Sequence, residues 1–213
     1  MSQTTVIKNA RVVNEGETHE AAVLIQRGRI EKIAADIAAP AGAGVYDAAG
    51  RHLLPGIIDD QVHFREPGLT HKGDFYSESR AAIAGGITSY MEMPNSKPTT
   101  TDAEQLEWKY ARAAQTSAAN YAFYFGATND NIDEIRALDP AATCGIKIFM
   151  GASTGNMLVD NEDTLAGIFR EARALITTHC ESTPLIQRNL EAALEKYGPE
   201  IPVTEHPAIR SAE

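Results

Sequence analysis

The chain has 213 residues, 43% of them hydrophobic, a length and composition that suit a globular core and exclude a disordered chain. Its 29 Asp and Glu residues outnumber 19 Lys and Arg residues, and the net charge of -10 excludes nucleic acid and anionic membranes as expected partners, leaving a small molecule. With two cysteines, no N-terminal leader pattern and no apolar run of membrane-spanning length, we expect a cytoplasmic protein.

Residues 1–52 are predicted to form a small β-sandwich domain. Turn-forming sequences at residues 14–16 and 26–28 separate short runs of strand-forming residues. These runs cover residues 5–7, 10–13, 21–25 and 30–33.

Residues 53–213 follow a different pattern, in which apolar runs of strand length alternate with segments of helical period. Strands are predicted at 56–62, 88–93, 121–126, 145–150 and 175–179, and helices at 103–117, 131–138, 162–174 and 184–197. Such an α/β pattern is typical of an open doubly wound sheet or of a (β/α)₈ barrel. Because a barrel needs roughly 250 residues, we expect about five βα units here, with the barrel truncated before strand six.

Polar side chains gather at the end of the first of these strands. Gln61, His63 and Arg65 are two residues apart, so they share one face of the strand, at the end where barrels carry their active sites. A lone histidine at this position is equally consistent with a hydrogen-bonded structural role. Asn95, after the second strand, starts an Asn-Ser-Lys-Pro sequence that also suits an ordinary turn.

Lys147 and His179 extend this pattern to two further strands. Lys147 is expected to point into the barrel, where an unpaired ammonium is costly, unless its strand is an edge or a carboxylate pairs with it. A chemical alternative is a carbamate on Lys147, an anionic ligand for two divalent cations. His179 ends another strand at the same rim. Imidazoles with an oxygen ligand between them predict a Zn²⁺ site for amide hydrolysis, with Arg65 and Asn95 holding an anionic substrate.

Four stretches of the chain resemble the motifs of dihydroorotases in the amidohydrolase superfamily, namely residues 54–68, 84–95, 146–149 and 179–181. The resemblance implies a β-sandwich beside a metal-dependent-hydrolase (β/α)₈ TIM barrel that interconverts L-dihydroorotate and N-carbamoyl-L-aspartate in pyrimidine biosynthesis. It implies that His63, carboxylated Lys147 and His179 bind one or two Zn²⁺ ions. It also implies that Arg65 and Asn95 bind the substrate carboxylate.

The chain departs from the family pattern in two places. The family has His-x-His after the first strand, whereas this chain has Gln61, whose amide oxygen is a much poorer zinc ligand. The sixth-strand His ligand and the eighth-strand catalytic Asp have no counterpart before Glu213. We therefore expect no catalytic residue and no activity in this chain alone, and His206, which resembles the approach to strand six, is left out of the ligand set.

The resemblance leaves alternatives beside dihydroorotase. Allantoinases usually carry Asn where this chain has Arg65, and hydantoinases lack the Arg-Glu-Pro-Gly sequence of residues 65–68, so dihydroorotase is favoured over a cyclic amidase of those types. Gln61 motivates the other alternative, a non-catalytic dihydroorotase-like scaffold subunit of aspartate carbamoyltransferase. We expect a homo-oligomer, with aspartate carbamoyltransferase as a partner in the scaffold case.

Overall fold

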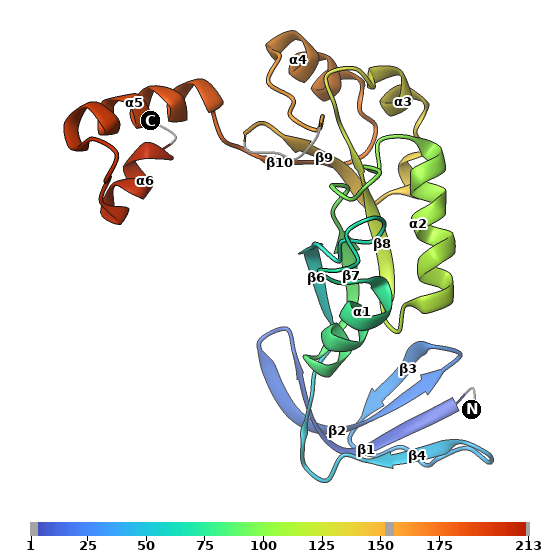
Figure 1. Ribbon diagram of the computed structural model, residues 1–213. Helices are drawn as coiled ribbons and strands as arrows, with labels where there is room; N and C mark the ends of the chain where they lie inside the picture. Colours follow the sequence, from blue (N-terminus) through green and yellow to red (C-terminus); the bar gives the residue numbers. More distant parts are fainter. Residues whose placement is uncertain (1–3, 152–155, 212–213) are drawn as a thin grey trace. The chain divides into compact units, whose positions relative to one another are not determined.

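A computed structural model describes residues 4–151 and 156–211, and the chain divides into two compact units, Met1–Gly56 and Ile57–Glu213 (Figure 1). The boundary predicted between residues 52 and 53 lies slightly earlier, inside the short strand β5 (His52–Leu53). Every helix among the described residues is too short or too polar to span a lipid bilayer.

The first unit contains a five-stranded mixed sheet. β1 (Thr4–Asn14), β2 (Glu17–Gln26) and β3 (Arg29–Ala34) form antiparallel hairpins, while β4 (Gly44–Asp47) and β5 pair with β1 in parallel. The turns at residues 15–16 and 27–28 have positive φ at both positions, the conformation that matches the twist of a two-residue hairpin. The two predicted strands at 5–7 and 10–13 are one strand with a register shift between Ile7 and Ala10.

The described residues of this unit form one sheet, so the second layer of the predicted composite β-sandwich stays a prediction. β4 and β5 extend the sheet alongside β1 instead of building a second layer. Each face of the sheet has its own small apolar cluster, since Ala22 on β2 points opposite to Ala21 and Val23. The clusters contain Ala10, Val12, Ala21, Val23 and Ala48 on one face and Val6, Ala22 and Ile37 on the other.

The second unit is built on five parallel strands in the order β10-β9-β8-β7-β6, which confirms the predicted strands. They are β6 (Ile57–Val62), β7 (Ile87–Glu92), β8 (Asn120–Gly126), β9 (Gly145–Phe149) and β10 (Ile176–His179). The sheet is open among the described residues, and Ile57, Ile58 and Leu175 near its two edges are 53%, 61% and 69% exposed. This part of the fold corresponds to five strands of the predicted barrel.

Helices lie between these strands and after the last of them. They are α1 (Phe75–Ala84), α2 (Ala103–Thr116), α3 (Ile132–Ala137), α4 (Glu162–Glu171), α5 (Thr183–Tyr197) and α6 (His206–Ile209), with 3₁₀ turns η1 (Pro140–Ala142) and η2 (Val203–Glu205). The sequence prediction missed α1, whose small and polar residues hide a helical period. A capping box starts this helix: Asp74 accepts from the Ser77 N–H at 2.7 Å, and the Ser77 hydroxyl accepts from the Asp74 N–H at 3.4 Å.

The core of this unit lies between the sheet and the helices that cover one of its faces (Figure 1). Side chains alternate along each strand, so one set enters this core and the other set points to the opposite face. On β9, Ile146 and Ile148 belong to the core cluster. Gly145, Lys147 and Phe149 therefore lie on the opposite face, which we call the inner face.

Candidate metal and substrate site

The chain leaves β6 and β7 through two loops that are tied together at the C-terminal edge of the sheet. The Met93 N–H donates to the Val62 carbonyl at 3.0 Å, and the Lys97 N–H donates to the Pro67 carbonyl at 3.1 Å. Gly68, with φ of +78°, packs directly on Lys97: a Cβ added to it would overlap the Lys97 carbonyl oxygen and lie 2.7 Å from the Lys97 Cβ. The two loops thus form one platform, in which a glycine is required at position 68.

This platform brings together two of the predicted site residues, His63 and Asn95. The His63 Nδ1 lies 2.9 Å from the Asn95 Oδ1. Because an amide oxygen can only accept, the hydrogen bond places the imidazole proton on Nδ1 and leaves the Nε2 lone pair available to a metal. Asn95 therefore orients His63, a role beyond the substrate contact that its sequence position predicts.

Electrostatics favour the neutral form of His63. Burial lowers the pKa of His63, and the positive charges of Arg65 and Lys147 lower it further, while the hydrogen bond with Asn95 acts in the opposite direction. A neutral imidazole is the form that binds a metal ion.

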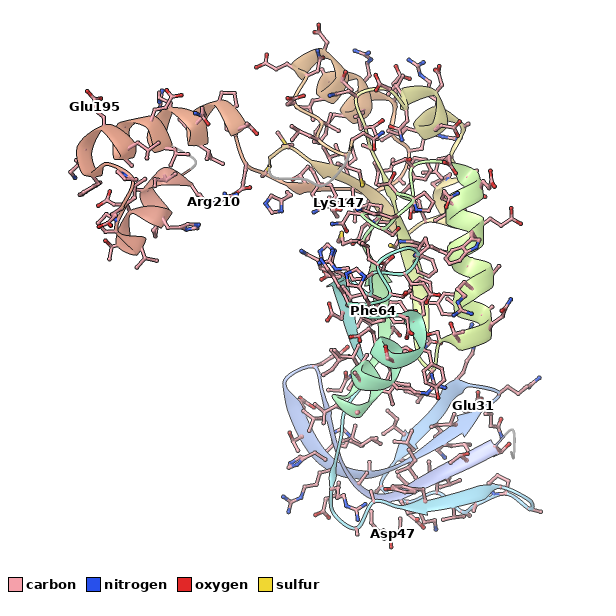
Figure 2. All side chains as sticks on the ribbon, in the orientation of Figure 1. Glu31, Asp47, Phe64, Lys147, Glu195 and Arg210 are labelled. Carbon is pink, nitrogen blue, oxygen red and sulfur yellow. The ribbon has the colours of Figure 1, made fainter. Side chains whose placement is uncertain are left out.

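Lys147 is buried on the inner face, with only 4% of its surface exposed (Figure 2). Its Nζ lies 5.1 Å from the centre of the Phe149 ring, and within the described ranges no carboxylate forms an ion pair with it. Burial accordingly lowers the pKa of Lys147. The β10 residue paired in register with Lys147 is Thr177, whose buried hydroxyl has no hydrogen-bond partner. A carbamate on Lys147 would offer acceptor oxygens in this neighbourhood.

His179 lies across the same aromatic ring as Lys147. Its imidazole stacks on Phe149, with ring centroids 6.2 Å apart and planes inclined by 29°. The His179 Nε2 lies 3.0 Å from the Glu181 Oε2, and Glu181 also accepts from the Arg210 Nε at 2.8 Å. Glu181 thereby fixes the tautomer of His179 and leaves Nδ1 free for a metal.

Gln61 lies on β6, next to Val62, which packs on the core of the helix-covered face. Alternation therefore puts Gln61 on the inner face with His63. The Gln61 side chain is exposed, and its backbone N–H donates to the Asp59 carboxylate at 3.1 Å. Across the described residues, no cluster of three or more His, Cys, Asp or Glu side chains is placed to hold a metal ion.

Two ion pairs beneath the platform, one buried and one partly buried, escaped the sequence prediction. Glu92 ends β7 and pairs with Lys109 of α2, and Glu66 pairs with Arg112 of the same helix, with 2.6 Å between Oε1 and Nε. Burial raises the pKa of Glu92 to about 7, although Lys109 acts against this shift. The sequence could have indicated that Lys109 is buried, because its spacing places it in the helical stripe of Leu106, Tyr110 and Ala113 that faces the core.

A separate cavity of about 440 Å³ lies between α2 and α3. Leu106, Tyr110, Phe125 and Leu138 contribute to its lining. Tyr110 and Phe125 belong to the side of the sheet that the helices cover, so the cavity is apart from the inner face. It contains none of the predicted site residues.

The chain is similar to known proteins in sequence and in fold. The family described as dihydro-orotase-like matches residues 50–155. A dihydroorotase of Methanosarcina acetivorans is 38% identical over 179 residues, 82% of this chain and 38% of the relative. An allantoinase of Streptomyces avermitilis is 34% identical over 200 residues, 91% of this chain and 44% of the relative.

A solved structure shows the same fold. The L-hydantoinase of Arthrobacter aurescens superimposes with a TM-score of 0.87 at 30% identity, covering 97% of this chain and 47% of that protein. The chain thus spans less than half the length of the relatives it matches. The match of sequence and fold confirms the resemblance read from the motifs: the chain belongs to the dihydroorotase-like family of cyclic amidohydrolases.

Proposed function

We propose that the protein containing this chain is a zinc-dependent dihydroorotase, which reversibly hydrolyses the cyclic amide of L-dihydroorotate to N-carbamoyl-L-aspartate. The observation that carries the proposal is Arg65, which follows His63 by two residues in the same loop and has no ion-pair partner in the described part of the chain. A free guanidinium fork matches a substrate carboxylate bidentately. Neither hydantoin nor allantoin carries a carboxylate.

The donor chemistry of the inner face suits zinc. His63 has Nε2 available, His179 has Nδ1 available, and the buried Lys147 amine has no carboxylate partner among the described residues. We assign these three residues, with Lys147 as its carbamate, to hold one or two Zn²⁺ ions. Bound zinc lowers the pKa of a water molecule to about 7 and polarises a carbonyl.

Other residues of this chain would bind the substrate and orient the ligand His63. Arg65 binds the substrate carboxylate and so orients the ring, while the Asn95 amide donates to the same carboxylate and its oxygen holds the His63 tautomer. Proton transfer to the leaving nitrogen is not assigned to a residue of this chain.

The test is a hydrolysis assay on the full-length protein with its metal content measured. We expect zinc, activity on dihydroorotate above that on hydantoin and allantoin, and a rise in KM for dihydroorotate in Arg65→Gln. The exposed Arg188 of α5 gives a matched control, Arg188→Gln, expected to leave KM unchanged. A zinc-loaded protein that hydrolyses hydantoin or allantoin but not dihydroorotate would assign the other cyclic amidase activities, which the relatives also represent.

Gln61 supports a second candidate, a non-catalytic scaffold subunit that binds aspartate carbamoyltransferase. An exposed amide on the inner face cannot replace an imidazole as a strong zinc ligand. In this case the full-length protein carries unmodified Lys147, holds no zinc after reconstitution and co-elutes with aspartate carbamoyltransferase. Zinc and a carbamate on Lys147, detected by metal analysis and ¹³C-labelled carbon dioxide, would exclude it.

A further inference from the structure

The orientation of His179 depends on one carboxylate, that of Glu181. The Glu181 Oε2 lies 3.0 Å from the His179 Nε2, and an ionised carboxylate can only accept, so the imidazole proton belongs on Nε2. The Glu181 side chain is only 18% exposed, and like any glutamate it can rotate about three bonds unless its neighbours prevent this. What holds Glu181 in place therefore also holds His179.

The turn after β9 fixes the backbone of this stretch. The His179 carbonyl accepts from the Met150 N–H at 3.0 Å and from the Glu181 N–H at 3.1 Å. Gly151 packs on the base of the Glu181 side chain, because a Cβ added to Gly151 would overlap the Glu181 Cβ. These contacts set the point at which the Glu181 side chain leaves the backbone, but they do not set the orientation of its carboxylate.

Arg210, the residue after α6, supplies that restraint. Its Nε donates to the Glu181 Oε1 at 2.8 Å, and its Nη2 donates to the same oxygen. Two donors on one rigid guanidinium plane hold a carboxylate more firmly than a single donor does. Since Arg210 binds Oε1 and His179 contacts Oε2, the two partners do not compete, and the contact with Arg210 keeps Oε2 directed at the imidazole.

A purely structural role is the alternative for Arg210. Glu181 lies just before α5 and Arg210 just after α6, so their ion pair joins the two ends of this helical segment. Another contact within the segment already ties its helices together, because the Tyr197 hydroxyl donates to the Glu205 Oε1 at 2.8 Å. The two contacts differ in one respect that an experiment can use: the ion pair reaches a candidate zinc ligand, and the hydrogen bond of Tyr197 does not.

We propose that Glu181 and Arg210 are positioning residues for His179: Arg210 orients the Glu181 carboxylate, which holds the ring proton on Nε2 and leaves Nδ1 for the metal. The inference rests on the proposed role of His179 as a zinc ligand. Both oxygens of the Glu181 carboxylate are engaged, so the pair acts through the imidazole and not as a ligand.

The test is Arg210→Met in the full-length protein, which removes the guanidinium and keeps an unbranched side chain. We expect the zinc affinity, measured by titration against a chelator, to fall roughly 10-fold. In the metal-free variant, the ring ¹⁵N chemical shifts of His179 at alkaline pH should report a mixture of both tautomers, whereas the wild type should show the Nε2–H tautomer.

The matched control is Tyr197→Phe, which removes the hydrogen bond to Glu205 without touching Glu181. Zinc affinity and the His179 tautomer should both stay at their wild-type values. An equal loss of zinc affinity in this control would overturn the proposal, because Arg210 would then do no more than fasten the helices.

A folded Arg210→Met variant with wild-type zinc affinity and the wild-type His179 tautomer also overturns the proposal. If this variant does not fold, Arg210→Lys, which keeps the charge but loses the planar fork, decides by the same two measurements. If the wild-type protein neither binds zinc nor hydrolyses dihydroorotate, the proposed function fails. The tautomer of His179 in the metal-free variants then still decides whether Arg210 holds this imidazole through Glu181.

Discussion

The contact between Gly68 and Lys97 makes a substitution at this glycine informative about the whole platform. In Gly68→Ala, the left-handed φ of +78° costs about 1–2 kcal/mol for a residue with a Cβ. The added Cβ would also meet the Lys97 backbone, with the carbonyl carbon at 2.9 Å, and overpacking of this kind costs about 1–3 kcal/mol. Lys97 cannot simply move away, because its own N–H is bonded to Pro67. The expected loss in the free energy of unfolding is therefore about 2–5 kcal/mol.

The matched control is Gly86→Ala in the same unit. Gly86 has a φ of +91°, and a Cβ there would meet nothing within 4 Å. This variant carries only the backbone strain, so it should lose about 1–2 kcal/mol. The difference between the two variants isolates the clash between the loops.

Urea unfolding measures both losses, and a hydrolysis assay on the full-length protein follows the site. Because the clash separates the loops that carry His63 and Asn95, Gly68→Ala should reduce hydrolysis by roughly 100-fold, whereas Gly86→Ala should not. Equal unfolding midpoints and equal activities in the two variants would refute the platform as a unit.

Three other substitutions have defined outcomes. Asp74→Ala should lower the free energy of unfolding by about 1 kcal/mol at pH 7. Because hydrogen bonds from Ser77 lower the pKa of Asp74, this difference in stability should persist above pH 4 and vanish as the pH falls through the lowered pKa. The stability of Asp74→Asn should show no such pH dependence. Asn95→Ala should weaken zinc binding by roughly 10- to 100-fold in a metal titration, since His63 loses its orienting acceptor, and Asn95→Asp should retain affinity. Lys147→Met should raise the unfolding free energy of the metal-free protein by on the order of 1 kcal/mol, because a buried ammonium is removed. The same variant should no longer incorporate labelled carbon dioxide. A metal-free variant that is less stable than the wild type would contradict this reasoning.

The strands of the second unit were predictable because each is a short apolar run bounded by turn residues. Helix α1 was not, because its start depends on the capping box at Asp74 and not on an apolar stripe. The pairing of β4 and β5 was not predictable either, since local pattern does not say which strand they join, and both pair with the distant β1. Pairing between segments far apart in the chain is a property of the folded state.

The candidate site, like the fold, was predictable only in part. Strand alternation correctly placed Lys147 opposite to Ile146 and Ile148. The hydrogen bond between His63 and Asn95, by contrast, depends on how two loops meet, and no spacing within either loop encodes it. The assignment of His63, Lys147 and His179 as metal ligands stays a prediction.

Gly145, at the start of β9, bears on how this protein avoids a misfolded sheet. A Cβ at this position would lie 2.9 Å from the Leu175 carbonyl oxygen and 3.0 Å from the Tyr124 ring, so the neighbouring strands leave no room for a side chain. If β9 slipped by one residue, Ile146 would enter this space and Lys147 would enter the apolar core. The crowding at Gly145 thus disfavours a one-residue slip of β9 and favours the register that presents Lys147 to the inner face.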